Sequence, residues 1–355
     1  MSNTTDSSAI ILLNDISAQV NRYMTLLVFL FGIIGNSFNT LVLSQPKLRS
    51  NPCVLYFLGS SVSSLGIVLV GLPTRLIAGW ISTDPTNTNS LLCKIRIFLL
   101  YGFRSTSVWL IVLATIDRWF VSSPQVRRRF LSSRRIAHKS IIIVHILSFL
   151  LWSQSLFCYN TNLPQAPLKC YGMTETCRIF NDVVYASSTV IIPSLLMLIF
   201  GFLTIHNINR SRRTIEPFIG MVIHMNHINK KIKRRRIRYN KGSLTGMLLL
   251  QVILLTLLSL PQAIHQLYLT FTIHVTRSPL RTAIENFIIN FDFSLTYVGN
   301  SIPFYIYTLT GALFRQTLIR LIRLTYRRLK LYLSDIYVDL TNYLFPVFRP
   351  QIASE

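Results

Sequence analysis

Hydrophobic residues occur in seven long runs that polar or basic segments separate. A helix that crosses the ~30 Å hydrocarbon core of a bilayer needs about 20 mainly apolar residues, and each run has that length. The pattern therefore predicts an all-α membrane protein, a bundle of seven transmembrane helices. The expected spans are approximately Tyr23–Ser44, Cys53–Pro73, Leu92–Ile116, Ile136–Phe157, Val183–His206, Leu244–Leu269 and Phe287–Gly311.

Composition agrees with a membrane protein and excludes two soluble classes. Hydrophobic residues make up 51% of the chain and charged residues only 14%, whereas soluble globular proteins carry roughly 25% charged residues. The formal charge of +24 would by itself suggest a nucleic-acid partner, but the low total charge argues against one. A disordered chain is excluded because such chains lack the apolar side chains that are abundant here.

Basic residues lie mostly in alternate connecting segments. They gather after the first, third, fifth and seventh runs, and Lys and Arg near the ends of spans favour the cytoplasmic side. This distribution predicts a multi-pass protein of the plasma membrane with three parts. They are an extracellular N-terminus over residues 1–22, a seven-helix domain over 23–311 and a cytoplasmic helix and tail over 312–355.

The segments expected outside the cell contain residues whose chemistry suits that compartment. Asn3 begins the sequence Asn-Thr-Thr, an acceptor for N-glycosylation. Cys53 falls on the cytoplasmic side, where thiols stay reduced. The other four cysteines, Cys93, Cys158, Cys170 and Cys177, fall outside, and they allow three pairings between which sequence does not choose. We expect Cys93 to pair with Cys170 or Cys177.

Several short motifs stand at matching places in the spans. They are Gly35-Asn36, Leu72-Pro73, Asp117-Arg118-Trp119 with Arg118 25 residues after Cys93, Pro193, Pro261, and Tyr307 in a run that follows Pro303. With these motifs the chain resembles a rhodopsin-like (class A) G-protein-coupled receptor over about Tyr23–Leu324. Asn51-Pro52-Cys53 and the run 304–307 resemble invertebrate FMRFamide-type peptide receptors.

The resemblance implies a switch at the cytoplasmic ends of the helices. Arg118 would pair with Asp117 at rest and contact a heterotrimeric G protein when active, with Trp119 and Tyr307 nearby and Pro261 as the pivot of the sixth span. Without the resemblance, Arg118 would simply snorkel to water and Pro261 would be a packing kink. Asn36, Pro73, Pro193 and Pro303 are expected to serve helix packing.

Four positions depart from the pattern of the family. Ser64 replaces the sodium-binding Asp of the second span, His145 replaces a Trp of the fourth, and no Trp stands two residues before Pro261. In the seventh span, Pro303 lies one place too early for the usual Asn-Pro-x-x-Tyr motif. These changes leave the fold in place and concern the residues that usually operate the switch.

Two basic segments are interpreted as contacts with lipid and protein. After Gly311, apolar residues alternate with Arg315, Arg320 and Arg323 at helical spacing, which predicts a short amphipathic eighth helix on the membrane surface. The basic run 230–238 directly precedes the sixth span. It would hold that helix end near anionic lipid, and the resemblance implies a second role in docking the G protein.

Charged groups inside a span are costly and mark functional sites by default. Arg104 lies about 16 Å below the outer end of the third span, at 1.5 Å per residue, and Asp292 lies in the outer part of the seventh. They would either pair with each other or contact a ligand separately. Further residues expected around the same cavity are Tyr101, His265, Gln266 and Arg96. A small peptide is the expected extracellular ligand.

Other functional classes find less support in the sequence. We find no hydrolase, zinc-protease or phosphate-loop motif, so an enzyme is not expected, and neither are a cofactor, a metal or a nucleic-acid partner. A transporter would show repeated halves, and none is evident. A receptor-like decoy that binds ligand without signalling remains an alternative, because the motifs of the sixth and seventh spans are incomplete.

Overall fold

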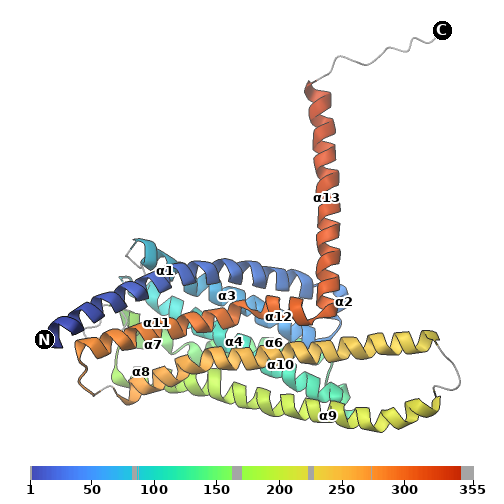
Figure 1. Cartoon of the computed structure of the whole chain (residues 1–355), viewed down its shortest axis with the longest axis horizontal. Coiled ribbons are helices and arrows are strands. Elements are labelled where there is room, and N and C mark those ends of the chain that lie inside the picture. Colours follow the sequence, from blue (N-terminus) through green and yellow to red (C-terminus); the bar gives the residue numbers. More distant parts are fainter. Residues whose placement is uncertain are drawn as a thin grey trace.

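Long helices packed side by side make up most of the molecule (Figure 1). The structure is a computed structural model that describes residues 2–81, 86, 88–161, 170–222, 228–272 and 274–344. The long helices of the bundle are α1 (Ser2–Leu43), α3 (Pro52–Ile81), α4 (Ser90–Ser122), α6 (Arg134–Trp152), α9 (Ile192–Val222), α10 (Ile228–Phe271) and α11 (Pro279–Ser301), which α12 (Pro303–Thr310) continues.

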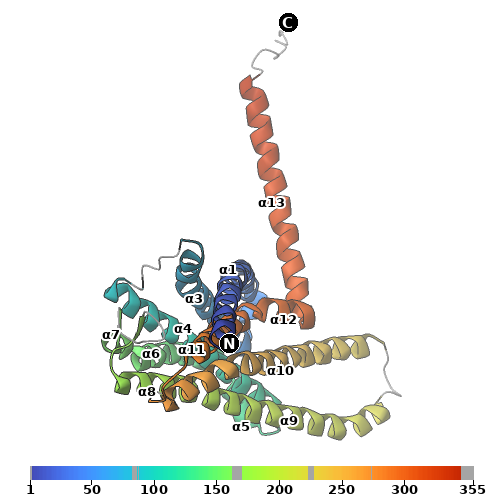
Figure 2. The same ribbon diagram turned by 60° about the vertical axis from the view of Figure 1, so that its left-hand side comes forward.

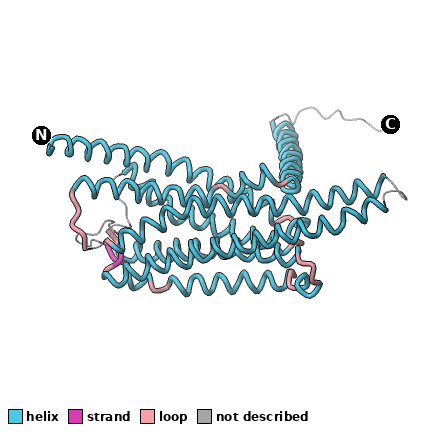
Figure 3. Tube along the Cα trace, turned by 60° about the horizontal axis from the view of Figure 1, so that its bottom comes forward, coloured by secondary structure: helices cyan, strands magenta, loops and turns pink. Residues whose placement is uncertain are grey.

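Shorter elements close the two ends of the bundle. They are α2 (Pro46–Arg49), α5 (Val126–Phe130), α7 (Ser155–Cys158), β1 (Tyr159–Thr161), β2 (Cys170–Gly172), α8 (Glu175–Val184), the π-helical segment η2 (Tyr185–Ile191) and α13 (Ala312–Leu344). Strands β1 and β2 form an antiparallel pair in which Asn160 lies opposite Tyr171. This pair lies at the end of the bundle opposite α13 (Figure 3). We call the end with the strands the disulfide end and the end with α13 the basic end.

Six helices in the described part of the chain are long and apolar enough to cross a membrane. They correspond to the first six predicted spans. The seventh predicted span coincides with α11 and α12, and it is interrupted at Ile302, because Pro303 has no N–H to donate and disfavours helix at the residue before it. Asn3 lies in the first turn of α1, but its side chain is outside the described part, so its glycosylation stays a prediction.

Proline shapes the helices in two ways. Pro73 and Pro261 lie inside α3 and α10, which continue past them. Pro193 lies two residues after the end of the π-helical segment Tyr185–Ile191. A proline in a helix clashes with the carbonyl four residues earlier, and the wider π turn moves that carbonyl away. The π-helical turn before Pro193 therefore accommodates the proline, and the helix continues past it.

The core has separate parts at the two ends of the bundle. Near the basic end, Phe57, Leu110, Tyr307 and Phe314 belong to one buried cluster, and near the disulfide end, Cys93, Tyr101, Trp152 and Tyr185 belong to another. Asn36 ties α1 to α11 between them. Its Nδ2 donates to the carbonyls of Gly32 at 3.0 Å and Asn300 at 3.1 Å.

The eighth helix is much longer than the short helix predicted. Helix α13 has 33 residues and projects away from the other helices (Figure 2). The sequence beyond Arg323 keeps the apolar and basic alternation and contains no glycine or proline before Pro346, so nothing ends the helix earlier. Most of its side chains beyond Leu321 are exposed.

Candidate functional site

At the basic end, Arg118 is buried in a network of polar groups. Its Nη2 lies 2.7 Å from Asp117 Oδ2 and donates to Asn51 Oδ1 at 2.9 Å. The second oxygen of Asp117 accepts a hydrogen bond from Ser132 Oγ at 2.6 Å. The Arg118 guanidinium thus connects the end of α4 to the start of α3. The Asp117 carboxylate connects the end of α4 to the turn before α6.

Cys53 adjoins this network, because its backbone N–H donates to Asn51 Oδ1. Its thiol is fully buried and donates to the carbonyl of Ala114 at 3.8 Å. The thiol also interacts electrostatically with Arg118. Cys53 takes part in no disulfide, as expected for the side of the bundle on which basic residues gather.

Trp119 and Tyr307 extend the contacts of this end to the other helices. The Trp119 ring packs on Phe200 of α9 with 5.1 Å between the ring centroids, and Arg128 lies over it at 5.1 Å. Tyr307 is fully buried and donates a short hydrogen bond to Gln251 Oε1 of α10. Any outward movement of α10 that separated it from α12 would break this bond.

A serine cluster occupies the middle of the bundle where the family would carry a sodium-binding Asp. Ser107 Oγ lies 2.9 Å from Ser60 Oγ and 3.0 Å from Ser64 Oγ. Hydroxyl groups can donate and accept, so the three satisfy one another without a charge. Pro261 lies farther toward the disulfide end, inside α10.

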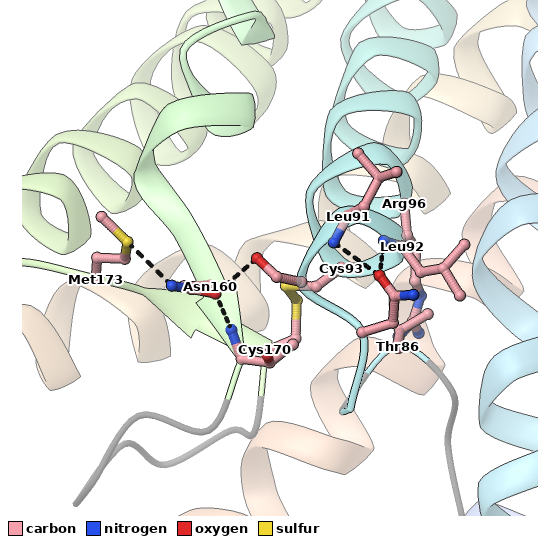
Figure 4. The surroundings of a disulfide bond; sticks show 11 residues. Thr86, Leu91, Leu92, Cys93, Arg96, Asn160, Cys170 and Met173 are labelled. Carbon is pink, nitrogen blue, oxygen red and sulfur yellow. Dashed lines mark hydrogen bonds between the residues drawn. A yellow bond between two sulfur atoms is a disulfide. The ribbon is translucent and has the colours of Figure 1, made fainter.

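At the disulfide end, two disulfides fix the strands to the helices. Cys93 of α4 bonds Cys170 of β2, and Cys158 of α7 bonds Cys177 of α8. The first is one of the two pairings expected for Cys93, and the alternative with Cys177 does not form. Figure 4 shows the first bond at the start of α4, where Asn160 accepts hydrogen bonds from Ser90 and from the backbone of Thr161.

The strands also bury aromatic side chains. Burial raises the pKa of the Tyr159 and Tyr171 phenols above their usual range, so both stay neutral at physiological pH. Arg178 of α8 stacks over the Tyr171 ring at 5.0 Å and donates to the carbonyl of Gly172 at 2.9 Å. The hairpin is thus fixed to α8 as well as to α4.

Arg104 lies in the interior of the bundle and is only 2% exposed. Its Nη1 donates to Gln262 Oε1 of α10 at 3.3 Å, and its guanidinium carbon lies 4.9 Å from the centre of the Tyr297 ring of α11. Gln262 Oε1 also accepts from Thr296 Oγ1 at 2.7 Å. Three helices therefore meet at this one group.

Asp292 does not pair with Arg104, which was one of the two arrangements expected. Its Oδ2 lies 3.0 Å from His265 Nδ1 instead. The sequence placed both residues inside spans but did not indicate that the Asp292 carboxylate turns toward α10. The His265–Asp292 pair lines a groove of about 760 Å³ between α10 and α11, which also includes Tyr268 and Glu285.

The remaining predicted ligand residues fall in different places. Tyr101 is buried, stacks on Trp152 with 4.5 Å between the centroids, and packs edge-on against Tyr185. Gln266 is also buried near this end. Arg96 lies apart from them, because it donates to Thr86 Oγ1 at 2.9 Å (Figure 4) and to the carbonyl of Gly71 at 3.3 Å.

Sequence reasoning missed several residues of both networks. Gln262, Tyr297 and Thr296 surround Arg104, while Asn51 and Ser132 surround Arg118 and Asp117. Gln262 gave a usable signal, since it is a polar residue next to Pro261 in an apolar run. Asn51 belongs to the Asn51-Pro52-Cys53 motif, but that motif did not indicate a contact with Arg118. Ser132, Thr296 and Tyr297 gave no signal, because these residue types are common whether or not they face a partner.

Comparison with known proteins identifies a family over most of the chain. Residues 35–302 match the family described as 7 transmembrane receptor (rhodopsin family). Neuromedin-U receptor 2 of Mus musculus is 21% identical over 335 residues, which cover 92% of this chain and 77% of the relative.

Two further relatives match over shorter stretches. A FMRFamide peptide receptor of Caenorhabditis elegans is 25% identical over 140 residues, 38% of this chain and 32% of the relative. A Gq-coupled rhodopsin of Mizuhopecten yessoensis is 26% identical over 189 residues, 52% of this chain and 35% of the relative. The matched part thus spans about a third of the length of each of these two proteins.

Proposed function

Because the chain belongs to the rhodopsin family of seven-transmembrane receptors, we propose that it binds an extracellular peptide at its disulfide end and activates a heterotrimeric G protein at its basic end. The observation that carries this proposal is the buried Arg118–Asp117 ion pair, 2.7 Å long, at the opposite end of α4 from the Cys93–Cys170 bond. A single rigid helix therefore connects a ligand end to an effector end.

The mechanism is a population shift between two arrangements of the bundle. In the arrangement described here, Asp117 and Asn51 hold Arg118, and the Tyr307–Gln251 bond holds α10 against α12. A peptide that prefers a bundle with α10 displaced, pivoting near Pro261, releases Arg118 for the G protein. By linkage, the bound G protein raises the affinity for the peptide in return.

A peptide is the favoured ligand because the relatives named for a ligand class include receptors for neuromedin U and FMRFamide peptides. Retinal is disfavoured despite the rhodopsin relative, because the seventh span, 287–311, contains no lysine. Arg104, Tyr101, Gln266, His265 and Asp292 are the proposed ligand residues. Arg96 is the least supported of the original set, because it already bonds Thr86 and Gly71.

The disulfide end is proposed to face the outside of the plasma membrane. Disulfides form and persist in oxidising compartments, and the basic residues gather at the other end of the bundle, which favours the cytoplasm. The N-terminus, with the acceptor Asn3, is then extracellular, and α13 is cytoplasmic. The basic run 230–238 lies in the first turns of α10, but its side chains are outside the described part of the chain.

Helix α13 is proposed to lie on the inner leaflet. Phe314, Leu318 and Leu321 pack against the core of the bundle, and Leu329 and Ile336 continue the same stripe at helical spacing. These last two side chains are 55% and 40% exposed. Arg328 and Lys330 flank the stripe, where their long side chains can reach anionic headgroups.

The test is nucleotide exchange on G proteins in membranes that contain the full chain, challenged with a peptide library. An active peptide should accelerate exchange, and Arg118→Ala should reduce the ligand-dependent rate at least about tenfold at equal surface expression. Arg135→Ala is the matched control, because that arginine is exposed at the same end.

Two results would point to other functions. Peptide binding without exchange on any G protein would favour a decoy, which the incomplete motifs of the sixth and seventh spans suggest. Solute flux through reconstituted protein would favour a transporter. Full activation by the Arg118→Ala variant would refute the role assigned to that arginine.

A further inference from the structure

Arg104 carries a buried charge without a counterion. Its side chain is 2% exposed, and its Nε and Nη2 atoms are buried with no hydrogen-bond partner. Among the residues that the structure describes, no carboxylate forms an ion pair with it. Gln262, the Tyr297 ring and the Tyr185 phenol interact with it, but all three are neutral. Such contacts offset only part of the cost of removing a guanidinium from water.

The nearby carboxylates are engaged by other groups. Asp292 pairs with His265 at 3.0 Å, and Asp182 accepts a hydrogen bond from Thr270 Oγ1 at 2.7 Å. Glu285 lies 3.1 Å from Arg277 and 2.9 Å from Arg281. None of these three carboxylates therefore compensates the charge of Arg104, a residue near the proposed ligand end.

The groups left unsatisfied around Arg104 are mainly donors. Besides Nε and Nη2 of the guanidinium, Gln262 Nε2 is buried without a partner. Nε and one terminal nitrogen of an arginine form a planar edge that fits the two oxygens of a carboxylate. A primary amide has a single acceptor oxygen and no charge, so it fits this edge less well than a carboxylate and does not neutralise the guanidinium.

An aromatic layer covers Arg104 on the side of the disulfide end. Tyr101 lies three residues before it on α4 and is buried between Trp152, at 4.5 Å, and Tyr185, at 5.5 Å between ring centroids. In the binding mode that we infer, a ligand that enters from the disulfide end displaces this layer when it reaches the guanidinium. If the ligand carries an anion at its tip, that anion pairs with Arg104 only after the layer is displaced. The ligand then binds the opened arrangement more tightly than the closed one, as a population shift requires.

We propose that the part of the ligand that reaches deepest into the bundle is a carboxylate that pairs with Arg104, so that the activating peptide ends in a free carboxyl group. This inference rests on the proposed function, because it concerns the same ligand end. The free C-terminus of a peptide and the acid group of a small organic acid offer the same chemistry, and experiment separates them.

The first experiment measures binding alone, by the unfolding temperature of the full chain in detergent. The probes are a pool of N-acetylated dipeptides with free carboxyl groups, the same pool as C-terminal amides, and benzoate with hexanoate as small acids. The acid dipeptides should bind roughly 10- to 100-fold more tightly than the amides. If the small acids alone bind, the source is an organic acid rather than a peptide.

Two variants show whether Arg104 causes this preference. Arg104→Gln should bring the ratio of acid to amide affinity close to one, whereas Arg104→Lys keeps the charge and should keep part of the preference. Arg22→Gln is the control, because that arginine lies at the same end but donates to the carbonyl of Gly79. The inference is overturned if acids and amides bind equally, if neither binds, or if Arg104→Gln retains the preference.

Nucleotide exchange then separates this inference from the proposed function. Acid-selective binding without exchange on any G protein would support the carboxylate site and refute signalling. Exchange that amidated peptides trigger as strongly as acids would support signalling and refute the carboxylate site.

Discussion

Arg118 is held from two sides, and only one of its partners was visible in the sequence. Asp117 is its neighbour in the chain, so the pair could be predicted from a three-residue motif. Asn51 and Ser132 come from segments that packing alone brings close, and their residue types gave no signal. The same limit explains Arg104 and Asp292, because the sequence placed both inside spans but did not indicate the directions in which their side chains point.

At this scale we predict that Asp117→Asn raises ligand-independent nucleotide exchange roughly tenfold. The change removes a buried charge that stabilises the closed position of Arg118, and hydrogen bonds to charged groups contribute about 1.5–3 kcal/mol. Ser132→Ala is the matched comparison, since it removes the 2.6 Å bond to Asp117 but keeps the ion pair. It should raise exchange less.

Both variants are measured at equal amounts of receptor in the membrane. If Asp117→Asn left basal exchange unchanged, the ion pair would not restrain the bundle, and the switch would have to lie elsewhere, for example at the Tyr307–Gln251 bond.

At the scale of elements, hydrophobic runs predicted where helices cross the apolar layer but not where they end. Helix α1 begins at Ser2 and α13 reaches Leu344, because the polar segments outside the runs contain no glycine or proline that would end a helix. The break at Ile302 follows from Pro303. Close contacts between helices were not predictable, since a glycine in a span gives no indication of what faces it.

Gly71 makes one of these contacts, between α3 and α11. A Cβ added there would overlap the hydroxyl of Tyr297, whereas a Cβ at Gly246 of α10 would meet nothing within 4 Å. We predict that Gly71→Ala destabilises the protein by about 1–3 kcal/mol through overpacking. Gly246→Ala should stabilise it by about 0.5–1 kcal/mol, because alanine favours helix.

Thermal unfolding of the full chain in detergent measures both glycine variants. Equal effects of the two substitutions would mean that α3 can move away from Tyr297 at little cost. Because the Tyr297 ring lies against Arg104, such freedom would also weaken the case for a rigid ligand end.

At the scale of the whole molecule, the basic residues that give the charge of +24 gather mainly at one end of the bundle. The fold class and the distribution of basic residues could be predicted from the sequence, because both depend on patterns along the chain. The length of α13 and its direction away from the bundle could not (Figure 1).

We predict that anionic lipid protects α13. In nanodiscs with phosphatidylserine, its backbone amides should exchange with deuterium at least about tenfold more slowly than in zwitterionic nanodiscs. Leu329→Glu should remove this protection because it places a charge on the apolar stripe. Leu331→Glu is the matched control, since Leu331 is 65% exposed and lies off the stripe.

Equal exchange in the two lipids, or equal effects of the two glutamates, would contradict an orientation along the membrane. Helix α13 would then extend into the cytoplasm and be available to another protein.

Cys53 has a consequence for anyone who wishes to follow this protein in time. Four of its five cysteines are bonded in pairs, so the native chain offers one thiol to an alkylating reagent. That thiol is fully buried and interacts with Arg118. Opening of the basic end must move Arg118. The rate at which Cys53 is alkylated therefore reports how often the basic end opens, without any added label.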